Sequence, residues 1–212
     1  MVEVFPGLRA VRIADADRLD TEVYILECDG GLILIDVGFT PECHVNIQAE
    51  LDKMSKTWED IKMIIITHAH GDHINNLPQV KELTGSEVIC GDGDEEVLKE
   101  RTGVPANFWL DTGDTLGACG GIVFIKVPGH SDGNLSLYLP KYKAIIAGDT
   151  IFGDSDGNLE APPEKYCKNV EAAAKNLKIL ADYDFDALLL SHGKNILNDA
   201  KEKVLKLIET CA

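Results

Sequence analysis

The sequence has no long hydrophobic run. Its longest apolar runs, such as the one around Ile64, are about five residues, whereas a helix that spans a membrane needs about 20. The N-terminal residues include Glu3 and Pro6 and lack the apolar core of a signal peptide. From these absences we predict a soluble protein of the cytoplasm.

Basic residues are few for a chain of this size. The 212 residues include 20 Lys and Arg against 36 Asp and Glu, which is a formal net charge of −16. Nucleic acids and anionic membranes bind basic surfaces, so the charge argues against both as partners. An acidic surface can still surround a locally cationic pocket, and we therefore expect a small-molecule substrate. The sequence does not indicate the oligomeric state.

Closely spaced cysteine pairs are also absent. The six cysteines are widely scattered and none forms a CxxC pair, which argues against a four-thiolate zinc site and a thioredoxin-type motif. In a reducing cytosol, free thiols are the favoured interpretation. The six are Cys28, Cys43, Cys90, Cys119, Cys167 and Cys211.

The chain contains several short apolar segments of strand type, followed by amphipathic segments of helix type, in both halves. Strands are expected at residues 21–28, 32–37, 61–67, 87–90, 121–127, 135–139, 144–147 and 187–190, and helices from Pro41, at 77–83, from Asp94, at 164–181 and at 198–209. The acidic run at residues 92–96 is interpreted as the solvated start of a helix. No linker divides the chain, so we predict one α/β (α+β) domain over residues 1–212, with two packed sheets and outer helices.

One cluster of histidines follows an expected strand directly. His68, His70, Asp72 and His73 lie within six residues, and neutral imidazole and carboxylate are good ligands for Zn²⁺. His68 and His70 are two residues apart in an extended segment and can face one ion together. After Gly71 the chain can turn, so that Asp72 and His73 face elsewhere. Because four ligands so close in sequence would crowd one tetrahedral ion, two neighbouring metal ions fit better.

Three more residues of the same chemical types stand where an expected strand ends. His130 follows residues 121–129, Asp149 follows residues 144–148, and His192 follows residues 187–191. Strand ends are where α/β proteins place their sites. Each residue alone is a weak signal, but together they bring five of the six histidines to strand-to-loop positions.

This set of residues resembles the hallmark of the metallo-β-lactamase-fold superfamily, which is HxHxDH followed by a distant His, an Asp and a final His. Asp36 matches the Asp that is typical of an early strand. The resemblance implies an αββα sandwich of two mixed β-sheets with a binuclear centre. It assigns His68, His70 and His130 to the first metal, Asp72, His73 and His192 to the second, and Asp149 to a bridge between them. Asp36 would hold the HxHxDH loop through hydrogen bonds.

Departures from the branches of this superfamily narrow the choice. Zinc β-lactamases usually have Cys in place of Asp149, and flavodiiron proteins have Glu in place of His70. Nucleic-acid-processing branches carry large extra domains and a positive surface. Many lactonases have a Tyr soon after the bridging Asp, where this chain has Thr150, Ile151 and Phe152. Glyoxalase II has a helical C-terminal extension that this sequence lacks or has much reduced. The remaining resemblance is to short glyoxalase II-like hydrolases.

The resemblance implies a metal-dependent hydrolase with two Zn²⁺ per chain, Fe or Mn being possible replacements. A zinc-bound hydroxide would attack a small acyl ester or thioester, and Asp72 would be the catalytic residue that orients it and passes on its proton. Two alternatives stay open. One is a lactonase of the same fold, and the other is a mononuclear iron oxygenase of the persulfide dioxygenase type, with iron on His68, His130 and Asp149. The substrate itself is not predicted.

Overall fold

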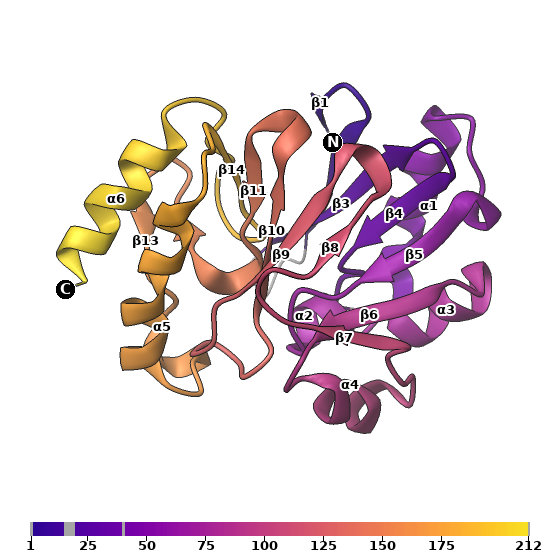
Figure 1. Ribbon diagram of the computed structural model, residues 1–212. Coiled ribbons are helices and arrows are strands. Elements are labelled where there is room, and N and C mark those ends of the chain that lie inside the picture. Colours follow the sequence, from indigo (N-terminus) through magenta and orange to yellow (C-terminus); the bar gives the residue numbers. More distant parts are fainter. Residues whose placement is uncertain (1, 15–19, 40, 212) are drawn as a thin grey trace. The chain divides into compact units, whose positions relative to one another are not determined.

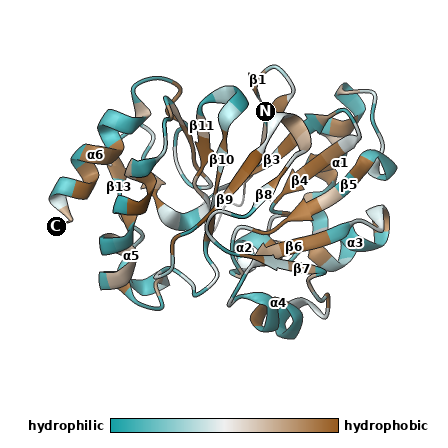
Figure 2. Ribbon diagram, in the orientation of Figure 1, coloured by the Kyte–Doolittle hydropathy of each residue, from teal (hydrophilic) through white to brown (hydrophobic). Residues whose placement is uncertain are grey.

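The computed structural model describes residues 2–14, 20–39 and 41–211. The chain divides into two compact units, a first unit at Met1–Trp109 and a second unit at Leu110–Ala212 (Figure 1). The strands carry most of the hydrophobic residues, whereas the helices combine hydrophobic and hydrophilic ones (Figure 2). The prediction of a single domain over residues 1–212 stays a prediction.

The first unit is built on a sheet in which strand order follows sequence order. Its strands are β1 Val2–Phe5, β2 Leu8–Ile13, β3 Thr21–Cys28, β4 Gly31–Ile35, β5 Ile61–Ile65, β6 Glu87–Gly91 and β7 Phe108–Leu110. Strands β1 to β4 pair antiparallel, and β4, β5 and β6 pair parallel. Parallel pairing brings the carboxyl ends of β4 and β5 to the same edge of the sheet.

Helices of the first unit share a core with one face of this sheet. The helices are α1 His44–Lys53, α2 Gly71–Ile74, α3 Leu77–Thr84 and α4 Glu95–Thr102, with 3-10 turns at Pro41–Cys43 and Trp58–Asp60. Ile47 of α1, Leu77 of α3 and Leu98 of α4 are completely buried in one cluster with alternating strand residues such as Leu34 and Ile64. Apolar residues on one side of each helix pack against this face of the sheet, and this packing explains why the helices cover it.

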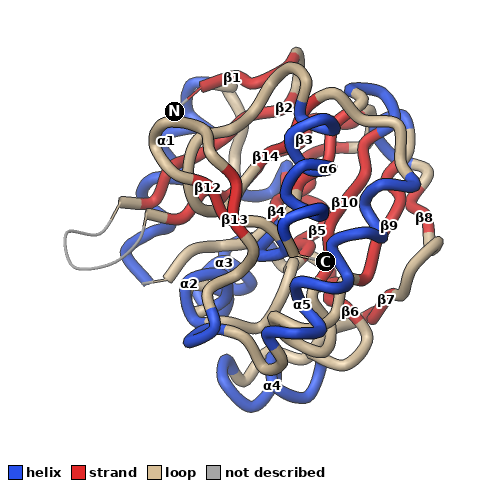
Figure 3. The backbone as a smooth tube through the Cα atoms, turned by 90° about the vertical axis from the view of Figure 1, so that its left-hand side faces the viewer, coloured by secondary structure: helices blue, strands red, loops and turns tan. Residues whose placement is uncertain are grey.

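The second unit has a five-stranded sheet of order β14-β11-β10-β9-β8 and a separate β12-β13 ribbon. The strands are β8 Thr115–Leu116, β9 Ile122–Lys126, β10 Leu135–Leu139, β11 Ala144–Ile146, β12 Phe152–Gly153, β13 Leu159–Glu160 and β14 Ala187–Leu189. The helices of this unit are α5 Val170–Asn176 and α6 Ala200–Thr210. Its 3-10 segments are at Ala118–Gly120, Pro140–Tyr142, Gly148–Thr150, Glu164–Tyr166 and Leu177–Asp182. Figure 3 looks onto α5 and α6. Val204 of α6 and Leu177, directly after α5, are buried in one core with Ile125 of β9 and Ile145 of β11.

Strand direction in the second unit brings three loops to one edge of its sheet. β9 and β11 both pair antiparallel with β10, and β14 pairs parallel with β11. The strands β9, β11 and β14 therefore run in the same direction. Their carboxyl ends lie at the same edge, and the segments that follow them carry His130, Asp149 and His192.

The prediction of one α-helix over residues 164–181 is wrong in its bounds. The α-helical part is only Val170–Asn176, and the segments on either side are 3-10 helix. The side chain of Asn169 accepts a hydrogen bond from the backbone N–H of Ala172, and this cap begins the α-helix later than expected. Strands β1 and β2 were not predicted at all, although the hairpin formed by β3 and β4 was.

The described cysteines include both free thiols and disulfide-bonded residues. Cys43, Cys90, Cys167 and Cys211 are free thiols, as expected. Cys28 and Cys119 are disulfide-bonded, so the prediction of six free thiols is wrong for these two. Spacing along the chain does not show which thiols find a partner in space. Among the described residues, no helix has the length and hydropathy that a membrane span requires.

Candidate metal centre

The HxHxDH segment of the first unit is anchored by a buried carboxylate, that of Asp36. Its side chain follows β4 and accepts hydrogen bonds from the backbone N–H and the hydroxyl of Thr67, both at 2.8 Å, and from Nδ1 of His73, also at 2.8 Å. The residue is 1% exposed and has a φ of 60°, a conformation that Asp tolerates better than most residues. The role predicted for Asp36, that of holding the loop, agrees with these contacts.

Asp36 also determines which nitrogen of His73 carries the proton. A carboxylate can only accept, so Nδ1 of His73 is the donor, and in the neutral imidazole Nε2 then keeps its lone pair. Nε2 lies 3.3 Å from Oδ2 of Asp72, at the start of α2. A lone pair and a carboxylate oxygen at this distance both present negative charge, and a cation between them would stabilise both. The donor set therefore fits a divalent metal ion.

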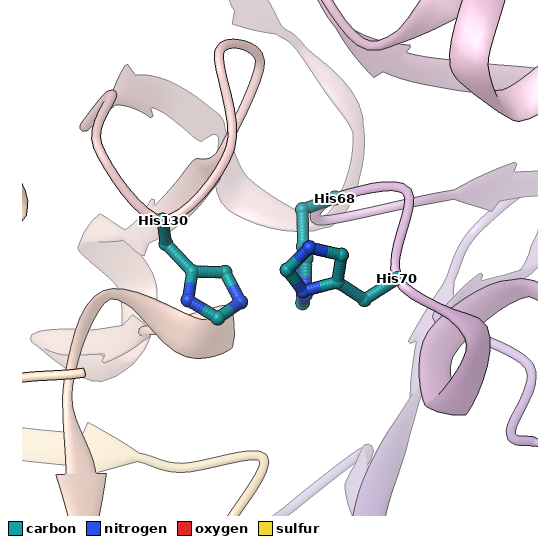
Figure 4. Close-up of side chains that lie close together, drawn as sticks. All are labelled: His68, His70 and His130. Atoms are coloured by element: carbon teal, nitrogen blue, oxygen red, sulfur yellow. The ribbon is translucent and has the colours of Figure 1, made fainter. Parts of the chain in front are cut away.

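The same carboxylate acts on His68 through Thr67. The Thr67 hydroxyl donates its proton to Asp36, so its oxygen is left to accept from Nδ1 of His68, 3.2 Å away. This leaves Nε2 of His68 with a lone pair. The rings of His68 and His70 meet edge to face with their centroids 4.7 Å apart (Figure 4). His68 is completely buried, whereas His70 is half-buried.

The three predicted ligands of the second unit meet around Asp149. Oδ2 of Asp149 lies 3.2 Å from Nε2 of His130, and Oδ1 lies 3.4 Å from Nε2 of His192. All three residues are buried, with at most 5% of their surface exposed. Because each carboxylate oxygen faces a different imidazole, Asp149 has the arrangement of a carboxylate that can serve two cations at once.

Two further side chains flank these histidines. The ring of Phe152 stacks on His192, with centroids 4.9 Å apart and an angle of 17° between the planes. The Sγ atom of Cys167 lies 4.0 Å from Nδ1 of His130. Burial, with the charge of Asp149 as a second cause, raises the pKa of the Cys167 thiol above its usual value. The thiol is therefore a neutral neighbour of His130.

A buried polar network supports the backbone turn that carries Asp149. The Thr150 hydroxyl lies 2.8 Å from Nδ2 of Asn134 and 2.8 Å from the hydroxyl of Ser136. The Ser136 hydroxyl also lies 2.9 Å from the carbonyl of Ala147, which it can donate to. All three polar side chains are at most 2% exposed. Buried hydroxyls and amides of this kind are costly when a partner is removed.

We expect Thr150→Val to reduce the free energy of unfolding of the metal-free protein by about 1–3 kcal/mol. Valine has the shape of threonine, but it leaves the Asn134 amide with one partner fewer in a buried site. Urea titration of the metal-free protein measures the change, and Thr150→Ser, which keeps the hydroxyl, is the control. An unchanged unfolding midpoint in Thr150→Val would contradict this account of the network.

The ligand-type residues and one supporting residue, Asp36, were predicted from the sequence, but other supporting residues were missed. Four predicted ligands, His68, His70, Asp72 and His73, lie in the first unit, and the other three lie in the second. Their imidazole nitrogens and carboxylate oxygens suit Zn²⁺, iron and manganese. Thr67 was missed as a link between Asp36 and His68. The available signal was a polar residue at the end of an otherwise apolar strand.

Comparison with protein families identifies the class of this protein. A family model described as the metallo-β-lactamase superfamily matches residues 16–193. The match covers most of the chain and includes Asp36 and all the predicted ligands. The chain belongs to the metallo-β-lactamase superfamily, most members of which are metal-dependent hydrolases.

Individual relatives are distant. The beta-lactamase-like protein 2 homolog of Caenorhabditis elegans is 26% identical over 196 residues, 89% of this chain and 61% of the relative. The uncharacterized protein YobT of Bacillus subtilis (strain 168) is 27% identical over 88% of both chains. A hydroxyacylglutathione hydrolase of Francisella philomiragia is 31% identical over 101 residues, 48% of this chain and 38% of the relative. The chain thus spans less than two thirds of the first and third of these relatives.

Solved structures confirm the fold class. A metallo-β-lactamase family protein of Thermus thermophilus superposes with a TM-score of 0.79 at 20% identity, over 98% of this chain and 80% of that one. The metallo-β-lactamase of Pontibacter korlensis has a TM-score of 0.77 at 18% identity, over 98% and 97% of the two chains. At such low identity the similarity shows the fold, a mixed α/β arrangement of several sheets and helices.

Proposed function

We propose that this protein is a binuclear zinc hydrolase that acts on a small acyl ester or thioester. The observation that carries the proposal is the arrangement around Asp149, whose two oxygens face two different imidazoles at 3.2 and 3.4 Å. Residues His68, His70 and His130 are proposed to hold one ion, and Asp72, His73 and His192 the other, with Asp149 shared. Family membership supports this set of ligands.

The chain's own residues have distinct roles in this proposal. When bound, the two ions would lower the pKa of a water toward neutrality and polarise the acyl carbonyl of the substrate. Asp72 accepts a hydrogen bond from the attacking group and carries the proton away. Its side chain is 31% exposed, against 4% for Asp149, so it can exchange that proton with solvent. Asp36 keeps the proton of His73 on Nδ1 throughout.

The net charge favours a small substrate, and the names of several relatives favour an acyl one. The net charge of −16 disfavours extended polyanions such as nucleic acid, but not a small molecule in a locally cationic site. Several curated relatives bear the name hydroxyacylglutathione hydrolase, which describes an acyl thioester hydrolase. The region that matches those proteins is less than half of this chain, so we do not assign their particular substrate to it. We also propose a cytoplasmic location and no membrane partner.

The test combines metal analysis with a substrate panel. We expect the purified protein to contain two zinc ions per chain and to hydrolyse thioesters or esters faster than lactones, β-lactams and phosphodiesters. Removing the metal with a chelator should abolish turnover, and adding Zn²⁺ should restore it. Metal content by elemental analysis and turnover on the same preparation provide the measurements.

Each other outcome of this experiment overturns a stated part of the proposal. One iron per chain with oxygen consumption would favour an oxygenase of the persulfide dioxygenase type. Preferred turnover of lactones would favour a lactonase. If metal-loaded protein hydrolyses no acyl substrate in the panel, the proposed function is wrong.

A further inference from the structure

The peptide groups between His68 and His70 are held by two side chains from one helix. The backbone N–H of Ala69 donates to Oδ2 of Asp94 at 2.9 Å, and the carbonyl of Ala69 accepts from Nη1 of Arg101, also at 2.9 Å. Ala69 itself is 2% exposed. Its methyl group cannot hydrogen-bond, so its two backbone groups depend on these partners among the described contacts.

Asp94 differs from the surface residue that its sequence context predicts. The run at residues 92–96 was expected to be a solvated helix start, but Asp94 is 2% exposed. It begins α4 without a capping hydrogen bond from its side chain, because the carboxylate contacts Ala69 instead. Burial, with the charge of Asp94 second, raises the pKa of the neighbouring Cys90 thiol to about 12. The carboxylate therefore lies in the interior, next to the loop.

Helix geometry explains how one helix contacts both groups of Ala69. Asp94 and Arg101 are seven residues apart, about two turns, so they lie on the same side of α4. Leu98, between them on that side, is completely buried in the core of the first unit. Packing of Leu98 thus fixes α4, and the two polar side chains fix the peptide that joins His68 to His70.

We infer that Asp94 and Arg101 are positioning residues for the two histidines. By holding both polar groups of Ala69, they set the separation and orientation of the His68 and His70 rings, and thereby the affinity of these rings for a metal ion. The inference rests on the proposed function, since it takes both histidines as ligands. It uses contacts within the first unit alone.

The decisive variant is Asp94→Ala, which leaves the N–H of Ala69 without its partner. We expect zinc affinity to fall by about 10- to 100-fold, the usual effect of losing a residue that orients a ligand. Asp94→Asn keeps an acceptor oxygen at the same position and should recover most of the affinity. Glu100→Gln, at an exposed position of the same helix, is the matched control and should behave as wild type.

Two measurements separate positioning from a general structural effect. Competition with a chromophoric chelator gives the zinc affinity, and the visible spectrum of the cobalt(II)-substituted protein reports the ligand geometry. We expect Asp94→Ala to change this spectrum and Glu100→Gln to leave it as it is. Circular dichroism of the metal-free proteins shows whether each variant folds.

Arg101→Met keeps the inference testable if Asp94→Ala does not fold. Arg101 is exposed, so its loss should not prevent folding, and we expect zinc affinity to fall by about three- to tenfold. Wild-type affinity and cobalt spectra in the folded variants would overturn the inference while leaving the proposed function intact. Wild-type protein that binds no metal would instead overturn the proposed function.

Discussion

Replacing Asp149 with alanine is expected to remove metal from one or both positions and to lower kcat/KM by about 10³-fold or more. The two oxygens of this carboxylate face His130 and His192 at 3.2 and 3.4 Å, so its loss removes a negative charge beside both imidazoles. A Lewis acid contributes several kcal/mol to charge stabilisation in the transition state, which corresponds to a factor of this size.

Metal content and kcat/KM are measured on the same Asp149→Ala preparation. The control is Asp156→Ala, which removes one negative charge at an exposed position of the same unit and should retain full metal and activity. Asp149→Asn tests charge separately from shape, because the amide keeps one acceptor oxygen but not the negative charge. Two ions and undiminished turnover in Asp149→Ala would show that Asp149 is not a ligand.

We expect Asp36→Asn to be the second most damaging change, although Asp36 is not a proposed ligand. The carboxylate accepts from the Thr67 N–H, the Thr67 hydroxyl and Nδ1 of His73. An amide has one acceptor oxygen and one donor nitrogen, so in either orientation its NH₂ group faces a donor. If that donor is Nδ1 of His73, the ring must move its proton to Nε2, which then cannot bind a metal ion.

The expected result for Asp36→Asn is a loss of about 2–4 kcal/mol in the free energy of unfolding. Zinc affinity should also fall by at least about 100-fold. Urea unfolding of the metal-free protein measures the first effect, and chelator competition measures the second. Thr67→Ser keeps both the hydroxyl and the N–H and is the matched control. Wild-type zinc affinity in a folded Asp36→Asn variant would contradict the proposed control of the His73 tautomer.

The fold was predictable where local patterns are strong. The hairpin of β3 and β4 follows from two apolar runs around Asp29 and Gly30, and α3 ends at Gly85, which has a φ of 65°. The predicted helix at residues 164–181 is α-helical only at Val170–Asn176, because Asn169 caps its start and the chain after Asn176 is a 3-10 helix. Strands β1 and β2 were missed because an edge hairpin with mixed polarity has little periodic signal of its own.

The candidate site shows the same division between local and long-range information. The imidazole and carboxylate side chains at strand ends, from His68 to His192, could be predicted from the sequence. Residue types and strand boundaries are local properties of the chain. The hydrogen-bond partners of Thr67 and Ala69 could not be predicted from the sequence. Asp36 is 31 residues from Thr67, and Asp94 is 25 residues from Ala69, so only parallel pairing and helix packing bring them together.

The sequence by itself determined the ligand chemistry, the strand ends that carry it, and membership of a metallo-β-lactamase-type family. Those features depend on residue type and short spacing. The tertiary structure decided the hydrogen-bond partners of His68 and His73 and the burial of Asp94. Each of these depends on which hydrogen-bond donors and acceptors from distant segments meet away from water, and no spacing along the chain specifies that. The scarcity of basic residues argues against large anionic partners, and that inference from the sequence stays a prediction.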